Sequence, residues 1–390
     1  MSKTLQDYAT LINDTIQSNE INHYITTDNM CQNLGGIDTF KNINIPQGKV
    51  RSFQKDDVLL SNIRLYFRKV YRAKQKGGCS SDVLVFRAKH IDSATLFAIL
   101  SSQIFTDYAC SGSQGSKMPR GNKTHMMDFK IPTINFTIAK IFNSIQNKIE
   151  NNHKINELLH KILELLYEQY FVRFDFLDEN NKPYQTSGGK MKFSKELNHL
   201  IPNDFEVKTL GELITWISGS QPPKSCHIYE HKKGYIRFIQ NRYYSSNDYI
   251  TYIPISKNNK ICYQYDIMID KYGEAGAVRF GLQGAYNVAL SKISVLNQSM
   301  QEYIRSYLNS KPIKKYLSNA CMASTRSSLN ENHIYSLMLP IPPINLLQKY
   351  EKIAKNIITA IIKNNQATQT LTALRDFLLP LLLKQQVKPQ

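Results

Sequence analysis

The stretch that decides the fold is residues 135–171, which read NFTIAKIFNSIQNKIENNHKINELLHKILELLYEQYF and contain no Gly or Pro. Apolar side chains recur in it every three or four positions, a spacing typical of a helix with a narrow apolar seam. At a rise of about 1.5 Å per residue, the stretch predicts a helix roughly 50 Å long. The expected seam consists of Ile141, Ile145, Ile149, Ile155, Leu159, Ile162, Leu166 and Tyr170.

A second stretch of the same kind covers residues 346–377 and follows Pro340, Pro342 and Pro343. Two helices with matching seams can pair along their length. We therefore expect an antiparallel coiled coil of the two long helices, which holds the segments before each helix apart with a pseudo-twofold relation. The expected seam of the second helix consists of Ile353, Ile357, Ile361, Leu371, Leu374 and Leu378.

The chain also repeats itself. From Ser116 onward, residues recur 208 positions downstream without a gap, and an earlier stretch recurs at an offset of 205. Such a period is far longer than a solenoid unit of about 20 to 50 residues, and it matches a domain with an appended helix. The clearest pairs are Ser116/Ser324, Asn122/Asn330, His125/His333, Pro132/Pro340, Ile145/Ile353, Leu163/Leu371, Leu5/Leu210 and Ile12/Ile217.

These patterns predict five segments. They are a first globular domain at 1–131, a helical segment at 132–178, a flexible linker at 179–195, a second globular domain at 196–339 and a second helical segment at 340–390. Both globular segments mix short β-like runs with helical patterns, so the expected class is α/β (α+β) in two copies. In the first copy we expect strands at 58–60 and 83–86 and one helix over 96–108.

The charge balance favours a polyanionic partner. The chain has 49 Lys and Arg against 31 Asp and Glu, a formal charge of +18. Such an excess attracts nucleic acid. The six cysteines form no Cys-x-x-Cys pair, which argues against a zinc cluster or a disulfide framework. With no signal-peptide pattern at the start and no apolar run of membrane-spanning length, we expect a cytoplasmic protein that does not enter a membrane.

The sequence offers no catalytic motif. It lacks the Asn/Asp-Pro-Pro-aromatic loop of an adenine methyltransferase, since Pro342-Pro343 lies between Ile341 and Ile344. It also lacks the Gly-x-x-x-x-Gly-Lys-Ser/Thr phosphate loop of a motor. The nine histidines have no metal-ligand spacing, and His125 and His333 lie in polar segments that favour helix capping. We expect no enzyme activity, no metal and no cofactor.

Four local motifs carry a resemblance to a known family. They are LPIPP at 339–343 before an amphipathic helix, DVLLS at 57–61, DIMID at 266–270, and the stretch from Ile201-Pro202 to residues 210–213 (LGEL). With the order domain, long helix, domain, long helix, the whole chain resembles the DNA-specificity subunit of type I restriction–modification systems. It departs from the family pattern at Leu347-Gln348, where many members have Glu-Gln, and at Ile131-Pro132, which lacks a second proline pair.

The resemblance implies a non-catalytic protein that binds double-stranded DNA. Each globular segment is then a target-recognition domain for one half of a split target, and the helices fix a gap of about one duplex turn. Two adenine-methyltransferase subunits would dock on the helices, and motor-nuclease (restriction) subunits would join the complex. The base sequence of the target cannot be derived from the residues.

Residues of the types that contact bases and phosphates occur at matching places in both copies. In the first copy they are a cluster after the 58–60 strand and two cations in a glycine-flanked loop: Arg64, Arg68, Lys69, Lys117 and Arg120. In the second copy they are Arg237, Arg242, Tyr243, Lys271, Tyr272, Arg279, Thr325 and Arg326.

Two other interpretations stay open. An orphan or alternative specificity subunit, acting as a target switch or as an inhibitor of related subunits, would keep the same fold, and the incomplete first helix entry motivates it. A freestanding RNA-binding adaptor would explain the charge and the helical seams, but it would leave the duplicated α/β segments without a reason.

Overall fold

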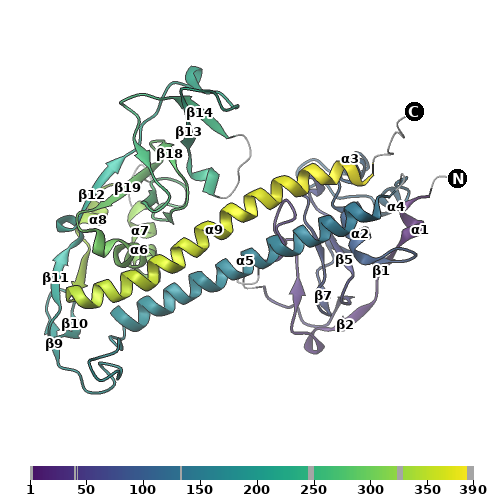
Figure 1. Cartoon of the computed structure of the whole chain (residues 1–390). Coiled ribbons are helices and arrows are strands. Elements are labelled where there is room, and N and C mark those ends of the chain that lie inside the picture. The colour runs from purple at the N-terminus through teal and green to yellow at the C-terminus, as the bar shows by residue number, and fades with distance from the viewer. Residues whose placement is uncertain are drawn as a thin grey trace. The chain divides into compact units, whose positions relative to one another are not determined.

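The computed structural model describes residues 3–38, 41, 43–131, 134–244, 250–322 and 328–383. The chain divides into two compact units, Met1–Lys154 with Gln366–Gln390, and Ile155–Asn365. Both units mix helices and strands, as the sequence predicts, and the labels used below are those of Figure 1.

The first unit contains two four-stranded sheets, with strand orders β1-β8-β5-β6 and β2-β4-β7-β3. Its strands are β1 (Ala9–Ile12), β2 (Thr15–Gln17), β3 (Tyr24–Ile25), β4 (Lys49–Phe53), β5 (Val58–Ser61), β6 (Val70–Arg72), β7 (Gly77–Cys79) and β8 (Val83–Ala88). Its short helices are α1 (Leu5–Tyr8), α2 (Ser93–Leu100), α3 (Gln103–Ser111) and α4 (Lys123–Met127).

The second unit also contains two four-stranded sheets, with orders β12-β19-β16-β17 and β14-β13-β18-β15, and two two-stranded sheets, β10-β9 and β11-β20. Its strands are β9 (Met191–Ser194), β10 (His199–Pro202), β11 (Glu206–Thr209), β12 (Ile214–Ser218), β13 (Tyr235–Ile239), β14 (Thr251–Pro254), β15 (Ile261–Cys262), β16 (Ile267–Asp270), β17 (Val278–Arg279), β18 (Gly284–Tyr286), β19 (Leu290–Val295) and β20 (Met338–Ile341). Its short helices are α6 (Gln301–Asn309), α7 (Lys311–Met322) and α8 (Asn332–Tyr335).

The first sheet of each unit follows one plan. β1-β8-β5-β6 and β12-β19-β16-β17 have the same strand order with every neighbouring pair antiparallel. The register also corresponds: Ala9 lies opposite Ala88, and Ile214 lies opposite Val295. The offsets of these partners, 205 and 207, are close to the offset of the sequence repeat. The repeat is therefore a repeat of structure.

The two aspartate motifs begin the central strands of these sheets. Asp57 Oδ2 accepts the Gln54 N–H at 2.8 Å, and Asp266 Oδ2 accepts the Tyr263 N–H at 2.9 Å. Each carboxylate thereby closes the turn before β5 or β16. Asp57 also accepts both Nε and Nη2 of Arg87 at 2.8 Å, which ties the turn to β8.

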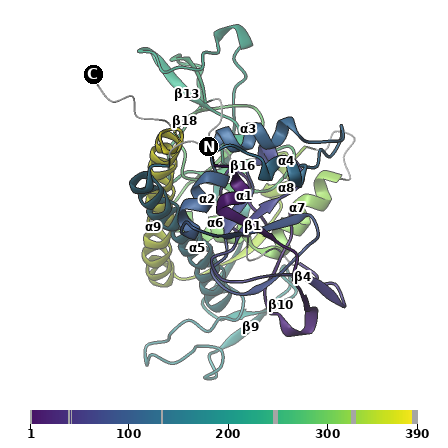
Figure 2. The ribbon, with the colours of Figure 1, turned by 90° about the vertical axis from the view of Figure 1, so that its right-hand side faces the viewer.

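The two long helices are α5 (Phe136–Phe171) and α9 (Ile344–Leu382), and α9 continues past the predicted end with Pro380 inside it. Within each unit they lie side by side (Figures 1 and 2). In the first unit, Arg375 Nη1 donates to Gln146 Oε1 and Asn152 Nδ2 donates to Thr368 Oγ1. In the second, Asn156 Nδ2 donates to Asn365 Oδ1 at 2.8 Å. The residue numbers of the partners decrease in α9 as they increase in α5, so the two helices run antiparallel.

The predicted seam is partly wrong. Ile141, Ile155, Ile162, Ile353 and Leu374 are exposed, whereas the polar side chains of Gln146, Asn152, Asn156 and Arg375 are buried. The reason lies in hydrogen bonds that periodicity does not reveal. Besides the bonds across the helix pair, Gln146 Nε2 donates to Leu34 O at 2.6 Å and Arg375 Nη1 to Asn33 O at 3.2 Å. These contacts turn the polar side chains inward and leave apolar ones facing solvent.

The single helix predicted over 96–108 is two helices, α2 and α3. Ser102 caps α3, because its Oγ accepts the Phe105 N–H at 3.2 Å. Its hydroxyl also donates to Ile99 O at 2.7 Å. A serine that bonds to neighbouring backbone competes with a continuous helix, so the helix breaks at this point.

The segment predicted as a flexible linker contains ordered turns and strand β9. The Tyr184 N–H donates to Phe176 O at 2.9 Å, and the two rings stack with centroids 4.9 Å apart. Strand β9 then pairs with β10 in a hairpin, with Phe193 opposite Leu200. The polar composition of the segment concealed these aromatic anchors.

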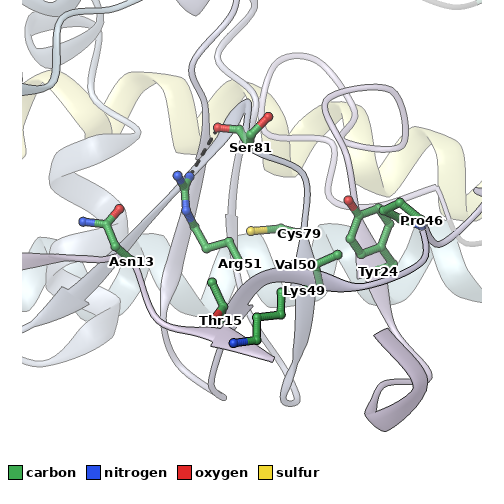
Figure 3. A pocket seen from close by; sticks show the side chains of 9 residues that line it. All are labelled: Asn13, Thr15, Tyr24, Pro46, Lys49, Val50, Arg51, Cys79 and Ser81. Carbon is green, nitrogen blue, oxygen red and sulfur yellow. Dashed lines mark hydrogen bonds between the residues drawn. The ribbon is translucent and has the colours of Figure 1, made fainter. Parts of the chain in front are cut away.

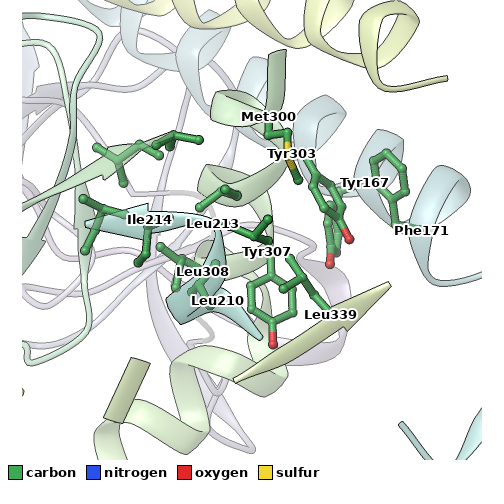
Figure 4. Close-up of a cluster of buried hydrophobic side chains, with 14 of the residues drawn as sticks. Tyr167, Phe171, Leu210, Leu213, Ile214, Met300, Tyr303, Tyr307, Leu308 and Leu339 are labelled. Atoms are coloured by element: carbon green, nitrogen blue, oxygen red, sulfur yellow. The ribbon is translucent and has the colours of Figure 1, made fainter. Parts of the chain in front are cut away.

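The core of the second unit is rich in aromatic rings contributed by both long helices and α6 (Figure 4). The Phe171 ring lies 4.5 Å from that of Tyr303 and 4.8 Å from that of Tyr350. Buried tyrosines need partners for their hydroxyls. Tyr350 donates to Ser306 Oγ, and Tyr303 donates to Pro340 O in the proline-rich entry to α9.

Glu351 of α9 predicts a pH dependence of stability. Its Oε1 accepts the Tyr303 N–H in the first turn of α6 at 2.9 Å. Burial, reinforced by the charge of Glu302, raises the pKa of Glu351 to about 8 from its ordinary 4.5. The folded state then holds a proton that the unfolded state releases. The free energy of unfolding should fall between pH 4.5 and 8, by about 4 kcal/mol.

Urea unfolding at several pH values across this range measures the effect. Glu351→Gln should reduce the dependence of the unfolding free energy on pH, because the amide that replaces the carboxyl does not titrate. Glu206→Gln, at an exposed position, is the matched control and should keep the slope. An unchanged slope in the Glu351→Gln protein would contradict the assignment.

Within the described residues, none of the helices combines the length and apolar character that crossing a membrane requires.

Candidate nucleic-acid interface

Three of the predicted cations of the first unit come together at one corner. The Arg64 N–H donates to Pro119 O at 2.9 Å, and its Nη2 lies 3.4 Å from Lys117 O. Arg120 pairs with Gln114 through two backbone hydrogen bonds of 2.8 and 2.9 Å, which close the glycine-flanked loop. Its guanidinium lies 3.0 Å from Asp82. Lys117 and Arg120 are exposed, so this loop offers positive charge to solvent.

Arg68 and Lys69 bond to the protein itself. Arg68 Nη2 donates to Ser101 O at 2.9 Å, and Lys69 Nζ donates to Thr27 O at 2.5 Å. Burial lowers the pKa of both side chains below their ordinary values. Both residues hold backbone segments in place, and they are less available to a phosphate than Lys117 is.

A polar hollow in the same unit lies against the β2-β4-β7-β3 sheet and was missed from the sequence (Figure 3). It has a volume of about 380 Å³. Arg51 Nη1 on its wall donates to Ser81 O at 3.3 Å and to Val83 O at 2.5 Å. The only sequence signal was the alternation of Lys49 and Arg51 in a β-like run. The lining residues are Asn13, Thr15, Tyr24, Pro46, Lys49, Val50, Arg51, Cys79 and Ser81.

Arg237, Arg242 and Tyr243 of the second unit form one group. The Cζ atoms of Arg237 and Arg242 lie 5.8 and 5.0 Å from the centre of the Tyr243 ring. Tyr243 is buried, and its Oη lies 2.7 Å from Thr251 Oγ1 and accepts from Arg242 Nη2 at 3.0 Å. Burial lowers the pKa of Arg237, although the neighbouring tyrosines oppose the shift. Arg242 is the exposed member of this group.

Lys271 and Tyr272 follow strand β16 directly. The Lys271 Nζ lies 5.9 Å from the centre of the Tyr272 ring, and Tyr272 is exposed. Arg279 on the neighbouring strand β17 differs, because its Nη2 lies 3.0 Å from Asp270 and 2.5 Å from Glu274. Two carboxylates neutralise its charge. Thr325 and Arg326 lie outside the described residues.

Each repeated histidine lies in the first turn of a short helix, where an asparagine three positions earlier accepts its backbone N–H. Asn122 Oδ1 accepts the His125 N–H at 3.1 Å, and Asn330 Oδ1 accepts the His333 N–H at 3.4 Å. The His125 ring also stacks on Tyr108 at 4.1 Å. No group of three or more His, Cys, Asp or Glu suited to a metal ion occurs among the residues that the structure describes.

Comparison with known proteins shows which family the chain is similar to. Residues 202–373, which hold most of the second globular segment and most of α9, match the model of the type I restriction modification DNA specificity domain. The resemblance drawn from the sequence is confirmed, and DNA target recognition is the role of this family.

The chain is similar to two specificity subunits from Methanocaldococcus jannaschii. It is 25% identical to the type I restriction enzyme MjaIX specificity subunit over 302 residues, 74% of this chain and 67% of the relative. It is 22% identical to the MjaVIII specificity subunit over 179 residues, 45% of this chain and 41% of the relative. The crystal structure of the type I restriction–modification system S subunit from M. genitalium shares the fold, with a TM-score of 0.63 and 15% identity over 99% and 96% of the two chains.

Proposed function

We propose that this protein reads a bipartite DNA target for a type I restriction–modification complex. Residues 1–131 and 196–339 act as target-recognition domains, one for each half-site. Residues 132–178 and 340–390 act as spacer helices. Residues 179–195 link the first spacer helix to the second target-recognition domain. The protein itself catalyses nothing in this proposal, and it works in the cytoplasm, where its six cysteines stay reduced.

The observation that carries the proposal is the repeated sheet with cations after its central strand. Strand β5 leads to Arg64, and the equivalent strand β16 leads to Lys271 and Tyr272. Exposed cations contact phosphates, and their neighbours can reach bases. Two copies of one such arrangement suit a target in two blocks. An antiparallel pair of helices about 50 Å long would set a gap of about one duplex turn between the blocks.

The exposed apolar side chains of α5 support a partner subunit. Ile155, Leu158, Ile162 and Leu165 are spaced by three, four and three positions, so they form one row on the helix. Each is between 42 and 52% exposed. A row of this spacing suits the apolar face of another helix. We propose that two methyltransferase subunits dock on the long helices and that restriction subunits join them.

Methylome sequencing of cells that carry this chain with a matching methyltransferase subunit tests the proposal. Adenine methylation should appear in a sequence of two blocks with a constant gap, and only when both proteins are present. Methylation at a single unsplit block would contradict it. Equal affinity of the protein for single-stranded RNA and duplex DNA would favour the RNA-adaptor interpretation.

Replacing cations of the candidate interface should separate the two half-sites. Lys271→Ala should weaken discrimination at one half-site, and the double variant Lys117→Ala/Arg120→Ala should weaken binding around the other. Each lost phosphate contact should also reduce the dependence of affinity on salt. Binding titrations at several salt concentrations, with each half-site mutated in turn, measure both effects. An equal loss of affinity for both half-sites would contradict the assignment of one half-site to each domain.

An orphan or alternative specificity subunit is the second candidate. The departure at Leu347-Gln348 favours it, because Leu347 is buried and contributes to the core, where many members have an acidic residue. Co-purification with the methyltransferase subunit separates the two candidates. An orphan subunit should bind DNA without retaining that partner.

A further inference from the structure

We propose that Tyr66 and Met118 contact the bases of the half-site read by the first unit, between phosphates held by Arg64, Lys117 and Arg120. This inference rests on the proposed function, and it assigns base contact to residues that the charge pattern alone did not single out.

Both side chains project into solvent from the corner that carries the cations. Tyr66 and Met118 are each 53% exposed. Tyr66 lies in the short 3₁₀ helix η2 (Leu65–Phe67), directly after Arg64 and Leu65. Met118 lies in the glycine-flanked loop between Lys117 and Pro119. Hydrogen bonds from Arg64 to Pro119 O and Lys117 O join the helix and the loop.

The backbone that presents Tyr66 is held firmly. Arg64 and Arg68 flank η2 with φ angles of 50° and 49°, in the left-handed region. Such backbone costs free energy and persists where the surroundings enforce it, often at functional sites. Here Leu65 is buried, the Asn33 N–H donates to Phe67 O at 2.9 Å, and Arg68 Nη2 holds Ser101 O. An exposed ring on a fixed support loses little freedom on binding.

The side chains around Tyr66 form a small stack. The Tyr66 ring meets Phe67 edge-on with centroids 4.7 Å apart, and the Arg64 guanidinium lies 6.0 Å from the centre of the Phe67 ring. Arg64 makes one side-chain hydrogen bond, at 3.4 Å, and its Nε is buried without a hydrogen-bond partner. Because Nε is buried, the donors that Arg64 offers to a phosphate are those of its Nη atoms beyond that bond.

The second unit carries a counterpart. After the equivalent strand β16, the exposed Tyr272 follows Lys271, as Tyr66 follows Arg64 after β5. Two copies of one fold thus place a cation and an exposed tyrosine in the segment that follows the equivalent strand. A surface tyrosine without a ligand would need no such repetition.

The chemistry suits duplex DNA. Cations fix the protein on the phosphates and carry no sequence information, whereas apolar and aromatic side chains touch thymine methyl groups or wedge between base steps. Tyr66 and Met118 supply apolar contact among cations, and a base surface satisfies both.

Selection from a pool of random-sequence duplexes, using the full chain alone and with its methyltransferase subunit, tests the inference. The bound fraction is sequenced, and affinities for the selected duplex are measured at several salt concentrations. Tyr66→Ala should reduce the preference for one half-site over random sequence about 10-fold, and Met118→Ala should act in the same direction. The other half-site and the salt slope should not change. Tyr66→Phe should keep most of the preference.

Ile45→Ala is the matched control, because Ile45 is an exposed apolar residue of the segment before β4, which belongs to the other sheet of this unit. If the wild-type protein selects a split sequence and the Tyr66→Ala protein selects the same sequence with equal affinity, the inference falls and the proposed function stands. A salt slope that falls with the affinity also overturns it, since the tyrosine would then act through the cations. If the wild-type protein selects no split sequence, the proposed function fails first.

Discussion

Replacing Ile162 and Leu165 with glutamate is expected to abolish binding of the methyltransferase subunit while the fold stays intact. Both side chains are nearly half exposed, so the free protein loses little core packing. In a complex, each would bury apolar surface worth about 1.5–3 kcal/mol, and a carboxylate in its place would also have to be desolvated. The expected loss of affinity is therefore at least about 100-fold.

Co-purification and calorimetric titration with the methyltransferase subunit measure this loss. Lys363→Glu is the matched control, because it places a carboxylate at an exposed position of α9 away from the row on α5. Circular dichroism and thermal unfolding should show no change in either protein. Binding of the double glutamate variant with wild-type affinity would exclude this row as the docking surface.

Asp57→Ala should lower the free energy of unfolding much more than the equivalent change Asp266→Ala in the second unit. The Asp57 side chain is 2% exposed, accepts two hydrogen bonds from Arg87 and closes the turn before β5. Its removal leaves Arg87 and the Gln54 N–H without their acceptor, at an expected cost of about 3 kcal/mol. The Asp266 side chain is 24% exposed and meets Lys292 at 3.2 Å, so its loss should cost about 1 kcal/mol.

Chemical denaturation of the two variants, monitored at high and low salt, makes this comparison. Asp57→Asn should recover part of the loss, because an amide oxygen can still accept the Gln54 N–H. Salt should affect the Asp266–Lys292 pair, whose carboxylate is 24% exposed, more than the Asp57–Arg87 pair, whose carboxylate is 2% exposed. Equal losses in the two variants would show that burial of the pair is not what distinguishes them.

Periodicity located the long helices but not the face by which they pair. Residues 135–171 lack Gly and Pro, so α5 follows from the sequence. Its rotation depends on Gln146, Asn152 and Asn156, which find partners on α9 and on the Asn33–Leu34 loop. A search for apolar residues at helical spacing assigned Ile155 and Ile162 to the seam, whereas both face solvent.

The candidate interface also has features that the sequence predicted and features that only the structure shows. The sequence indicated where cations gather after the central strands, and the structure describes Arg64 and Lys271 there. The sequence did not indicate which of these cations form ion pairs or hydrogen bonds within the protein. Arg279 is neutralised by Asp270 and Glu274, and Lys69 holds a carbonyl 42 positions away. A charge count cannot separate such residues from free ones.

By itself the sequence determined the duplication, the places of the long helices and the positive charge, because these depend on composition and on spacing within short windows. The tertiary structure decided which helix faces meet, which cations remain available, and that Tyr66 stands exposed on a fixed turn. Those outcomes depend on burial and on hydrogen-bond partners far away in the chain. Arg375 and Asn33, 342 positions apart, are one such pair.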